Sequence, residues 1–418
     1  MAPTVWQFND PVYQQRLRAA KRKQVGGLIG LIMYPEPRHL LVAACFLATL
    51  TAYVERTGFS IAYTLLAKEA RVDEATKGKV MSAFYWGYGI SQIPGGMAAQ
   101  KYGGSAVLTV SFLLWSTASM LTPGRADSTN AMMMARFIVG ASQGFVIPSI
   151  HTALSLWVPA KERAKAVSLT TSGMYLGSAA AMQLLPMVSR RYGAAFILRL
   201  VAILGYIWVY LWRRVVARLD AAGTTDRIPM AQVGGKDSHV AERRYRRSKT
   251  PWKELLSSAA VWSIVINNYT FHYAFYIVMN WLPTYFDKVL NTSIESVGVA
   301  KTLPYLAMFL TSNVGGWSGD YFIKRMGVSV ATGRKIVNTL GFWTAGGALL
   351  MMPTARSVAS GIFFTTSALA CCGFSRGGFS VNHMDIAPKY AGMVMYVCLF
   401  SSWFFISVFS MHAFTACS

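Results

Sequence analysis

Acidic residues are scarce in this 418-residue sequence, in which 17 Asp and Glu stand against 40 Lys and Arg. The four charged types together make up only 14% of the chain, whereas hydrophobic residues make up 54%. A soluble domain typically carries about 25% charged residues. This composition therefore excludes an ordinary soluble globular domain.

Cysteine is also rare, and the five cysteines lie in or beside apolar blocks without the spacing of metal ligands: Cys45, Cys371, Cys372, Cys398 and Cys417. We interpret them as buried thiols, which excludes a disulfide framework and predicts no metal site. The first 37 residues have no serine, unlike a transit peptide, and their apolar run "GGLIGLIMY" is short for a signal peptide. We therefore interpret residues 1–38 as a basic cytoplasmic segment.

Long apolar blocks are what the sequence does contain. They are about 20 residues long, which is enough to cross a hydrocarbon core about 30 Å thick. The expected spans are residues 39–66, 79–100, 104–122, 131–158, 165–188, 194–212, 259–286, 297–319, 335–353, 357–382 and 390–414. The sequence therefore predicts an all-α, multi-pass membrane protein with about eleven spans.

Positive charge gathers in the connectors between these blocks, and the net charge is +23. Clustered Lys and Arg can indicate nucleic-acid binding, but charge in short loops is typical of topology signals and of contact with anionic lipid. We expect lipid contact, no nucleic-acid partner and a cytoplasmic N-terminus. The polar stretch 213–258 is expected to be a cytoplasmic linker between membrane domains at 39–212 and 259–414.

The two membrane domains resemble each other in sequence. "SQIPGGMAAQKYGG" (91–104) is similar to "TSNVGGWSGDYFIKRMG" (311–327), about 220 residues later, and both place a polar turn after Gly-Gly. Two six-span halves related in this way are the architecture of the major facilitator superfamily, whose substrate site lies between the halves. Because the chain stops after about eleven spans, we expect the last helix to be missing and interpret the sequence as truncated.

Six motifs in order resemble the anion:cation symporter branch of that superfamily. This branch comprises solute carrier family 17 and the plant phosphate and anion carriers. The motifs are "SAFYWGYGISQIPGG" (82–96), "SGMYLGS" (172–178), "WLPTYFDKVL" (281–290), "NVGGWSGD" (313–320), "VATGRKIVNTLGF" (330–342) and "NHMDIAPKYAG" (382–392). The resemblance implies a monomeric secondary carrier of inorganic phosphate or an organic carboxylate, with Na⁺ or H⁺ as coupling ion and no other cofactor.

Arginines within spans are the strongest candidates for substrate contact, since each costs about 2.5–3.5 kcal/mol on insertion scales. Arg56 lies where the family has its substrate-binding arginine, and a guanidinium suits phosphate or carboxylate. The alternative for Arg56 is an ion pair with Glu55. Arg136 opens "RFIVGASQG", in which Gly140 and Gly144 share a face that admits a neighbouring helix.

Arg136 is expected either to be buried and functional or to snorkel to the interface from the end of its span. Arg376 departs from the family pattern, in which this position is uncharged. It is expected either to contact substrate or to reach the cytoplasmic interface. We add His272 and Tyr85 as further substrate-contact candidates.

Gln143 is the main departure in the proton-coupling residues. The family usually has glutamate there, and Gln has no titratable proton, so coupling through this position is not expected. The remaining titratable candidates are Glu55, His151 and His272. In the loop after the second span, Gln100 replaces an acid of the cytoplasmic gate, whereas Asp320 keeps the matching acid in the second half.

Asn382, His383 and Asp385 lie at the end of the tenth span. We interpret them as gating residues in a cytoplasmic turn, and the alternative of a hydrolytic centre would make the protein a membrane enzyme. A third class is an anion sensor or scaffold, or an inactive truncated carrier, that binds without transport. The leading hypothesis is a carrier that is not an enzyme. The sequence does not distinguish plastid, endomembrane and plasma membranes.

Overall fold

The computed structural model describes residues 37–126, 128–158, 162–221, 252–288, 290, 302–386 and 394, and none of these lies in a β-strand. The helices are α4 (Pro37–Glu69), α5 (Glu74–Tyr102), α6 (Gly104–Leu121), α7 (Thr129–Gln143), α8 (Val146–Trp157), α9 (Arg163–Tyr192), α10 (Ala194–Ala221), α12 (Trp252–Ser257), α13 (Ala259–Lys288), α14 (Leu303–Arg325), α15 (Val330–Met351), η5 (Met352–Thr354), α16 (Val358–Phe379) and α17 (Asn382–Ile386). The predicted all-α fold is confirmed.

Ten of the eleven predicted spans coincide with these helices, and the eleventh, 390–414, lies outside the described residues except for Val394. In the described part, six helical stretches are long and apolar enough to cross a membrane: Arg38–Glu69, Gly104–Leu121, Thr129–Trp157, Ala194–Asp220, Val330–Thr354 and Val358–Phe379. Helices α9 and α14 have spanning length but pack against each other. A helix covered by protein does not need an apolar surface all round, which accounts for their lower hydropathy.

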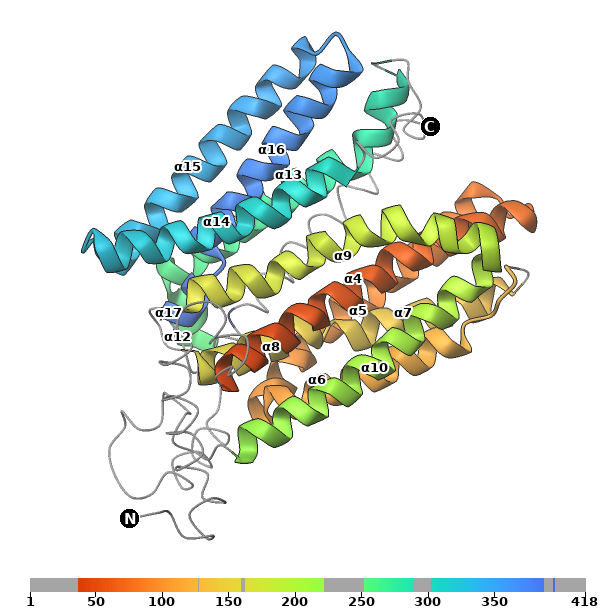
Figure 1. The fold of residues 1–418 in the computed structure, drawn as a ribbon, viewed down its shortest axis with the longest axis horizontal. Coiled ribbons are helices and arrows are strands. Elements are labelled where there is room, and N and C mark those ends of the chain that lie inside the picture. The colour runs from red at the N-terminus through yellow and green to blue at the C-terminus, as the bar shows by residue number, and fades with distance from the viewer. Residues whose placement is uncertain are drawn as a thin grey trace, which may run out of the picture.

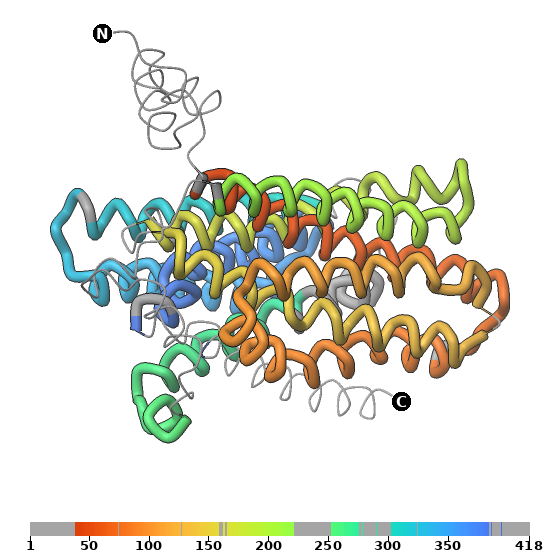
Figure 2. The backbone as a smooth tube through the Cα atoms, turned by 90° about the horizontal axis from the view of Figure 1, so that it is seen from below, coloured from red at the N-terminus to blue at the C-terminus, as the bar shows by residue number. Residues whose placement is uncertain are grey.

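The helices form two groups, as the colour order in Figures 1 and 2 shows. In the first group, α4 packs on α9 and α10, and α5 packs on α7. In the second group, α14 and α15 both pack on α16, and the two groups meet through α9 and α14. The groups converge at the end where α12 and α17 lie and diverge toward the other end (Figure 1).

Two predicted boundaries differ from the structure. The span 131–158 is divided, because α7 ends at Gln143 and α8 begins at Val146. Pro148 has no N–H to donate to the carbonyl of Gly144, so the helical hydrogen bonding is interrupted there. Helix α10 continues to Ala221, so the first nine residues of the predicted linker 213–258 are helical. The domain assignment itself stays a prediction.

Glycines on α7 let α5 approach closely, which confirms the shared face predicted for Gly140 and Gly144. A Cβ on Gly140 would overlap with the carbonyl oxygen of Phe84, and a Cβ on Gly144 would overlap with Ser91. We expect Gly140→Ala to destabilise the protein by about 1–3 kcal/mol, because the backbones must separate. Thermal unfolding of the purified protein in detergent measures this.

The matched control is Gly346→Ala on α15, where an added Cβ would meet no atom within 4 Å. That substitution is expected to be neutral or stabilising by up to about 1 kcal/mol, because alanine favours helix more than glycine does. Equal melting temperatures for the two variants would contradict the close contact between α5 and α7.

Candidate functional site

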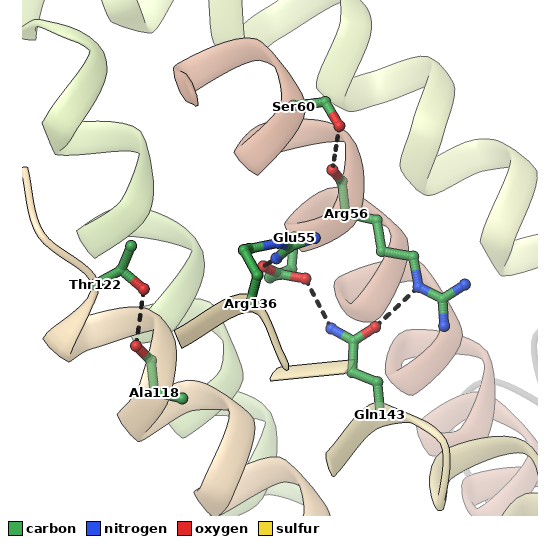
Figure 3. Close-up of polar contacts among 7 residues, drawn as sticks. All are labelled: Glu55, Arg56, Ser60, Ala118, Thr122, Arg136 and Gln143. Carbon is green, nitrogen blue, oxygen red and sulfur yellow. Dashed lines mark hydrogen bonds and ion pairs between the residues drawn. The ribbon is translucent and has the colours of Figure 1, made fainter. Parts of the chain in front are cut away.

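A chain of four polar side chains lies inside the first group of helices (Figure 3). Arg136 Nη1 lies 2.6 Å from Glu55 Oε1, in a buried ion pair. Gln143 Nε2 donates to Glu55 Oε2 at 2.8 Å, and Arg56 Nε donates to Gln143 Oε1 at 2.9 Å. Gln143 therefore links the ion pair to the second arginine.

Helix geometry explains this order of contacts. Glu55 and Arg56 are neighbours on α4, so their side chains point about 100° apart. Arg136 and Gln143 are seven residues apart on α7, which is about two turns, so both face α4. Glu55 therefore pairs with Arg136, and Arg56 donates to Gln143.

Aromatic rings surround both guanidinium groups. The Cζ atom of Arg56 lies 4.6 Å from the ring centroid of Tyr53, 4.8 Å from that of Phe84 and 4.6 Å from that of Tyr88. Arg136 Cζ lies 3.9 Å above Phe59 and 4.7 Å from Phe84. Cations over aromatic faces are stabilised by about 2 kcal/mol or more when desolvated. Phe84 thus lies against both arginines.

The two arginines differ in exposure. Arg136 is 3% exposed and Glu55 is 1% exposed, whereas Arg56 is half-buried. The snorkelling alternative for Arg136 is therefore wrong, because its guanidinium is buried and ion-paired. Arg136 neutralises Glu55, while Arg56 keeps a part of its surface accessible. A substrate-binding role for either arginine stays a prediction.

Arg376 lies where the two groups of helices meet. It is 4% exposed, and its Nη1 donates to the hydroxyl of Tyr175 on α9 at 2.8 Å. Its Cζ lies 4.9 Å from the ring centroid of Phe271 on α13. The side chain of Arg376 is thus enclosed by residues of α9 and α13, and its contact with substrate stays a prediction.

The other two substrate-contact candidates lie beside these arginines. His272 is half-buried, and its Nδ1 lies 2.8 Å from the backbone oxygen of Asn268 in the same helix. Tyr85 is 48% exposed and packs edge-on against Phe84. Within the described residues its ring stacks on neither arginine, and Tyr88, three residues later, covers Arg56 instead.

Two histidines join the groups of helices. The Nδ1 of His151 on α8 lies 2.6 Å from the Nε2 of His383 on α17, and both side chains are fully buried. One imidazole must donate to the other, so either Nδ1 of His151 or Nε2 of His383 must carry a proton. The structure thus brings together two candidates 232 residues apart.

Asp320 makes a second connection between the groups. Its Oδ2 accepts from the backbone N–H of Lys165 at the start of α9 at 3.2 Å, and its Oδ1 lies 3.6 Å from Nη1 of the buried Arg334. A carboxylate is favourable at a helix N-terminus. Asn382 is half-buried at the start of α17, and the Asp385 side chain lies outside the described part.

Sequence reasoning missed four aromatic residues at the arginines: Tyr53, Phe84, Tyr175 and Phe271. Tyr53 precedes Arg56 by three residues, so it lies on the same face of α4, and this spacing was the available signal. Nothing in the sequence places Tyr175 or Phe271 beside Arg376, since they come from other helices. In the described residues, no group of three or more His, Cys, Asp or Glu side chains could hold a metal ion.

Two groups of long helices that meet around buried arginines define a multi-pass α-helical membrane protein. The family model described as "Major Facilitator Superfamily" matches residues 45–411. The chain belongs to this superfamily, and within it to the anion transporter branch, as the six motifs predicted.

Individual relatives agree with this. "Probable anion transporter 6" of Oryza sativa subsp. japonica is 44% identical over 362 residues, which cover 86% of this chain and 83% of the relative. "Sodium-dependent phosphate transport protein 1, chloroplastic" of Arabidopsis thaliana is 30% identical over 359 residues, which cover 86% of this chain and 69% of the relative.

A solved structure has the same fold. The proton:xylose symporter XylE, bound to 6-bromo-6-deoxy-D-glucose, matches with a TM-score of 0.68 and 13% identity, over 88% of this chain and 86% of that chain. At this identity the likeness concerns the fold alone. The predicted major facilitator superfamily fold is therefore confirmed.

Proposed function

We propose that the protein is a secondary transporter of small anions, inorganic phosphate or an organic carboxylate, and that Arg56 is the main contact of the anion in the first half. The observation that carries the proposal is the difference between the two linked arginines. Arg136 is buried and neutralised by Glu55, whereas Arg56 is half-buried, with its Nε held by the neutral Gln143. A guanidinium oriented in this way offers planar donors to a carboxylate or phosphate.

The names of the relatives support an anionic substrate. One is called an anion transporter and another a sodium-dependent phosphate transport protein. The aromatic rings around Arg56 restrict access of water, so an oxyanion bound there experiences the guanidinium charge at a low effective dielectric constant.

Alternating access needs contacts that close one end and then separate. His151–His383 and Asp320–Lys165 both connect the two groups at the end where they converge. We propose that this end faces the cytoplasm, as the basic connectors predict, and that these two contacts close the cytoplasmic side. Opening would separate both contacts.

Coupling through protons in the first half is disfavoured. Both oxygens of Glu55 accept from groups that only donate, a guanidinium and an amide nitrogen. A proton on Glu55 would displace one of these donors, and Gln143 takes up none. We therefore propose that Na⁺ or the membrane potential drives transport.

The test is uptake of labelled phosphate and glutamate into proteoliposomes under separate Na⁺, pH and voltage gradients. Arg56→Ala is expected to reduce uptake about 10- to 100-fold, because a hydrogen bond to a charged group contributes about 1.5–3 kcal/mol. Arg56→Lys should restore only part of it, because lysine lacks the planar fork. The matched control is Arg191→Ala, which removes an exposed arginine at the end of α9 and should leave uptake unchanged.

If wild type and Arg56→Ala take up anion equally, the assignment of Arg56 is wrong. If wild type binds anion but moves none under any gradient, the protein is a sensor or scaffold and the transport proposal fails.

A further inference from the structure

Arg376 is a buried cation that has no acidic partner among the side chains the structure describes. Its hydrogen bond goes to a neutral hydroxyl, that of Tyr175, and its Nε has no hydrogen-bond partner among the described residues. Its other contacts are the faces of Tyr175 and Phe271. By contrast, the buried Arg136 and Arg334 each lie beside a carboxylate, Glu55 and Asp320.

The sequence leaves few acids that could neutralise Arg376. From residue 259 to the end there are only four, Asp287, Glu295, Asp320 and Asp385, and residues 387–418 contain none. Asp320 is engaged with Arg334 and the start of α9. Within the described side chains, no carboxylate lies within ion-pair distance of Arg376.

An uncompensated charge in such a place is costly, since removing water from an ion without pairing it is strongly unfavourable. Helical membrane proteins keep such residues where a ligand or ion binds. The five donors of the guanidinium are only partly used by Tyr175. An anionic ligand would supply both the missing charge and the missing acceptors.

Arg376 belongs to the same interior as Arg56. The ring centroid of Tyr53 lies 4.6 Å from the Cζ atom of Arg56. Tyr53 also packs beside Met174, the residue before Tyr175. One arginine comes from α4 of the first group and the other from α16 of the second.

We propose that Arg376 is the second anion contact of the site, and that the transported substrate is a compact anion of charge −2 that bridges Arg56 and Arg376. A divalent oxyanion and a short dicarboxylate share this chemistry. Tyr175 positions the guanidinium through its hydroxyl. Because Arg376 and Arg56 come from different halves, a bridging dianion favours the state in which the halves approach around it. This inference rests on the proposed anion transport and specifies its substrate class.

The test compares divalent and monovalent anions matched in shape. Binding of succinate against butyrate, and of sulfate against perchlorate, is measured by calorimetry on the purified full chain at neutral pH. For wild type we expect tighter binding of the dianion in at least one pair. That pair identifies the substrate class as dicarboxylate or inorganic oxyanion. Arg376→Gln should weaken dianion binding about 10- to 100-fold, the range for a lost charged hydrogen bond, and monoanion binding by less than about threefold.

Two further variants keep the test decisive if Arg376→Gln fails to fold. Arg376→Lys keeps the charge and should retain the preference for dianions, whereas Tyr175→Phe should reduce it without abolishing it. Equal losses for both anion classes, or an unchanged preference in Arg376→Gln, would overturn the proposal. If Arg56→Ala retains all anion binding, the proposed role of Arg56 is wrong. If Arg56→Ala loses anion binding but Arg376→Gln keeps the wild-type preference for dianions, only the present inference is overturned.

Discussion

Glu55→Gln is expected to lower the free energy of unfolding by about 3–5 kcal/mol, the range for removing one partner of a buried ion pair. The substitution keeps the size of the side chain, removes its charge and replaces one of its two accepting oxygens with a donor nitrogen. Arg136, which is 3% exposed, then remains buried over Phe59 and Phe84 with no carboxylate to neutralise it. Thermal and denaturant unfolding of the purified protein in detergent measures the loss.

Two comparisons separate this effect from a general loss of charge on α4. Glu69→Gln removes an exposed carboxylate from the end of the same helix and should change stability by less than about 0.5 kcal/mol. The double variant Glu55→Gln, Arg136→Gln removes the whole buried pair. It is expected to be more stable than Glu55→Gln alone, because no charge is left without a partner. A double variant less stable than the single one would mean that shape, and not charge, holds these helices together.

The helices could be predicted because apolar runs of about 20 residues have few alternatives in a membrane. The ends of the helices were harder to predict from the sequence. The division at Gly144 depends on Pro148, four residues further along, and the apolar pattern continues across it. The close contact of α5 and α7 was predicted at Gly140 because small residues one turn apart on a membrane helix are typical of close helix–helix packing.

The arginines of the site could also be predicted, since a charge within a span is costly and therefore informative. Their partners could not, because the Arg136–Glu55 contact joins residues 81 apart and the His151–His383 contact joins residues 232 apart. The choice of Tyr85 in place of Tyr88 shows the remaining difficulty. Both lie in one aromatic motif, three residues apart, and the sequence alone does not indicate which of the two rings lies over Arg56.

Gln143→Glu is expected to make anion uptake strongly dependent on pH. In the wild-type protein the amide of Gln143 donates to Glu55 with its nitrogen and accepts from Arg56 with its oxygen. A glutamate in the same place would bring a second carboxylate to Glu55, where the amide nitrogen of Gln143 now lies 2.8 Å from Oε2, and like charges this close favour a shared proton even between Arg136 and Arg56. The pair therefore binds a proton that the wild-type network does not contain.

The sign of the effect follows from Arg56. At low pH the shared proton keeps residue 143 neutral, as in the wild-type protein, and Arg56 remains available for the anion. As the pH rises and the proton leaves, the second carboxylate pairs with Arg56 and competes with the substrate. Uptake by Gln143→Glu should therefore fall with rising pH, by up to about tenfold per pH unit for a single coupled proton, whereas wild-type uptake gains no pH dependence from this position.

Proteoliposome uptake at a series of equal internal and external pH values measures the profile, and a proton gradient imposed afterwards tests coupling. Gln143→Asn is the matched control, because it alters the length of the side chain without adding a titratable group. If Gln143→Glu follows the wild-type pH profile, the glutamate does not lie between Glu55 and Arg56. The amide of Gln143 is then not the reason that the wild-type network takes up no proton. If uptake by the variant is driven by the proton gradient while the wild type is not, one amide nitrogen distinguishes an uncoupled from a proton-coupled network.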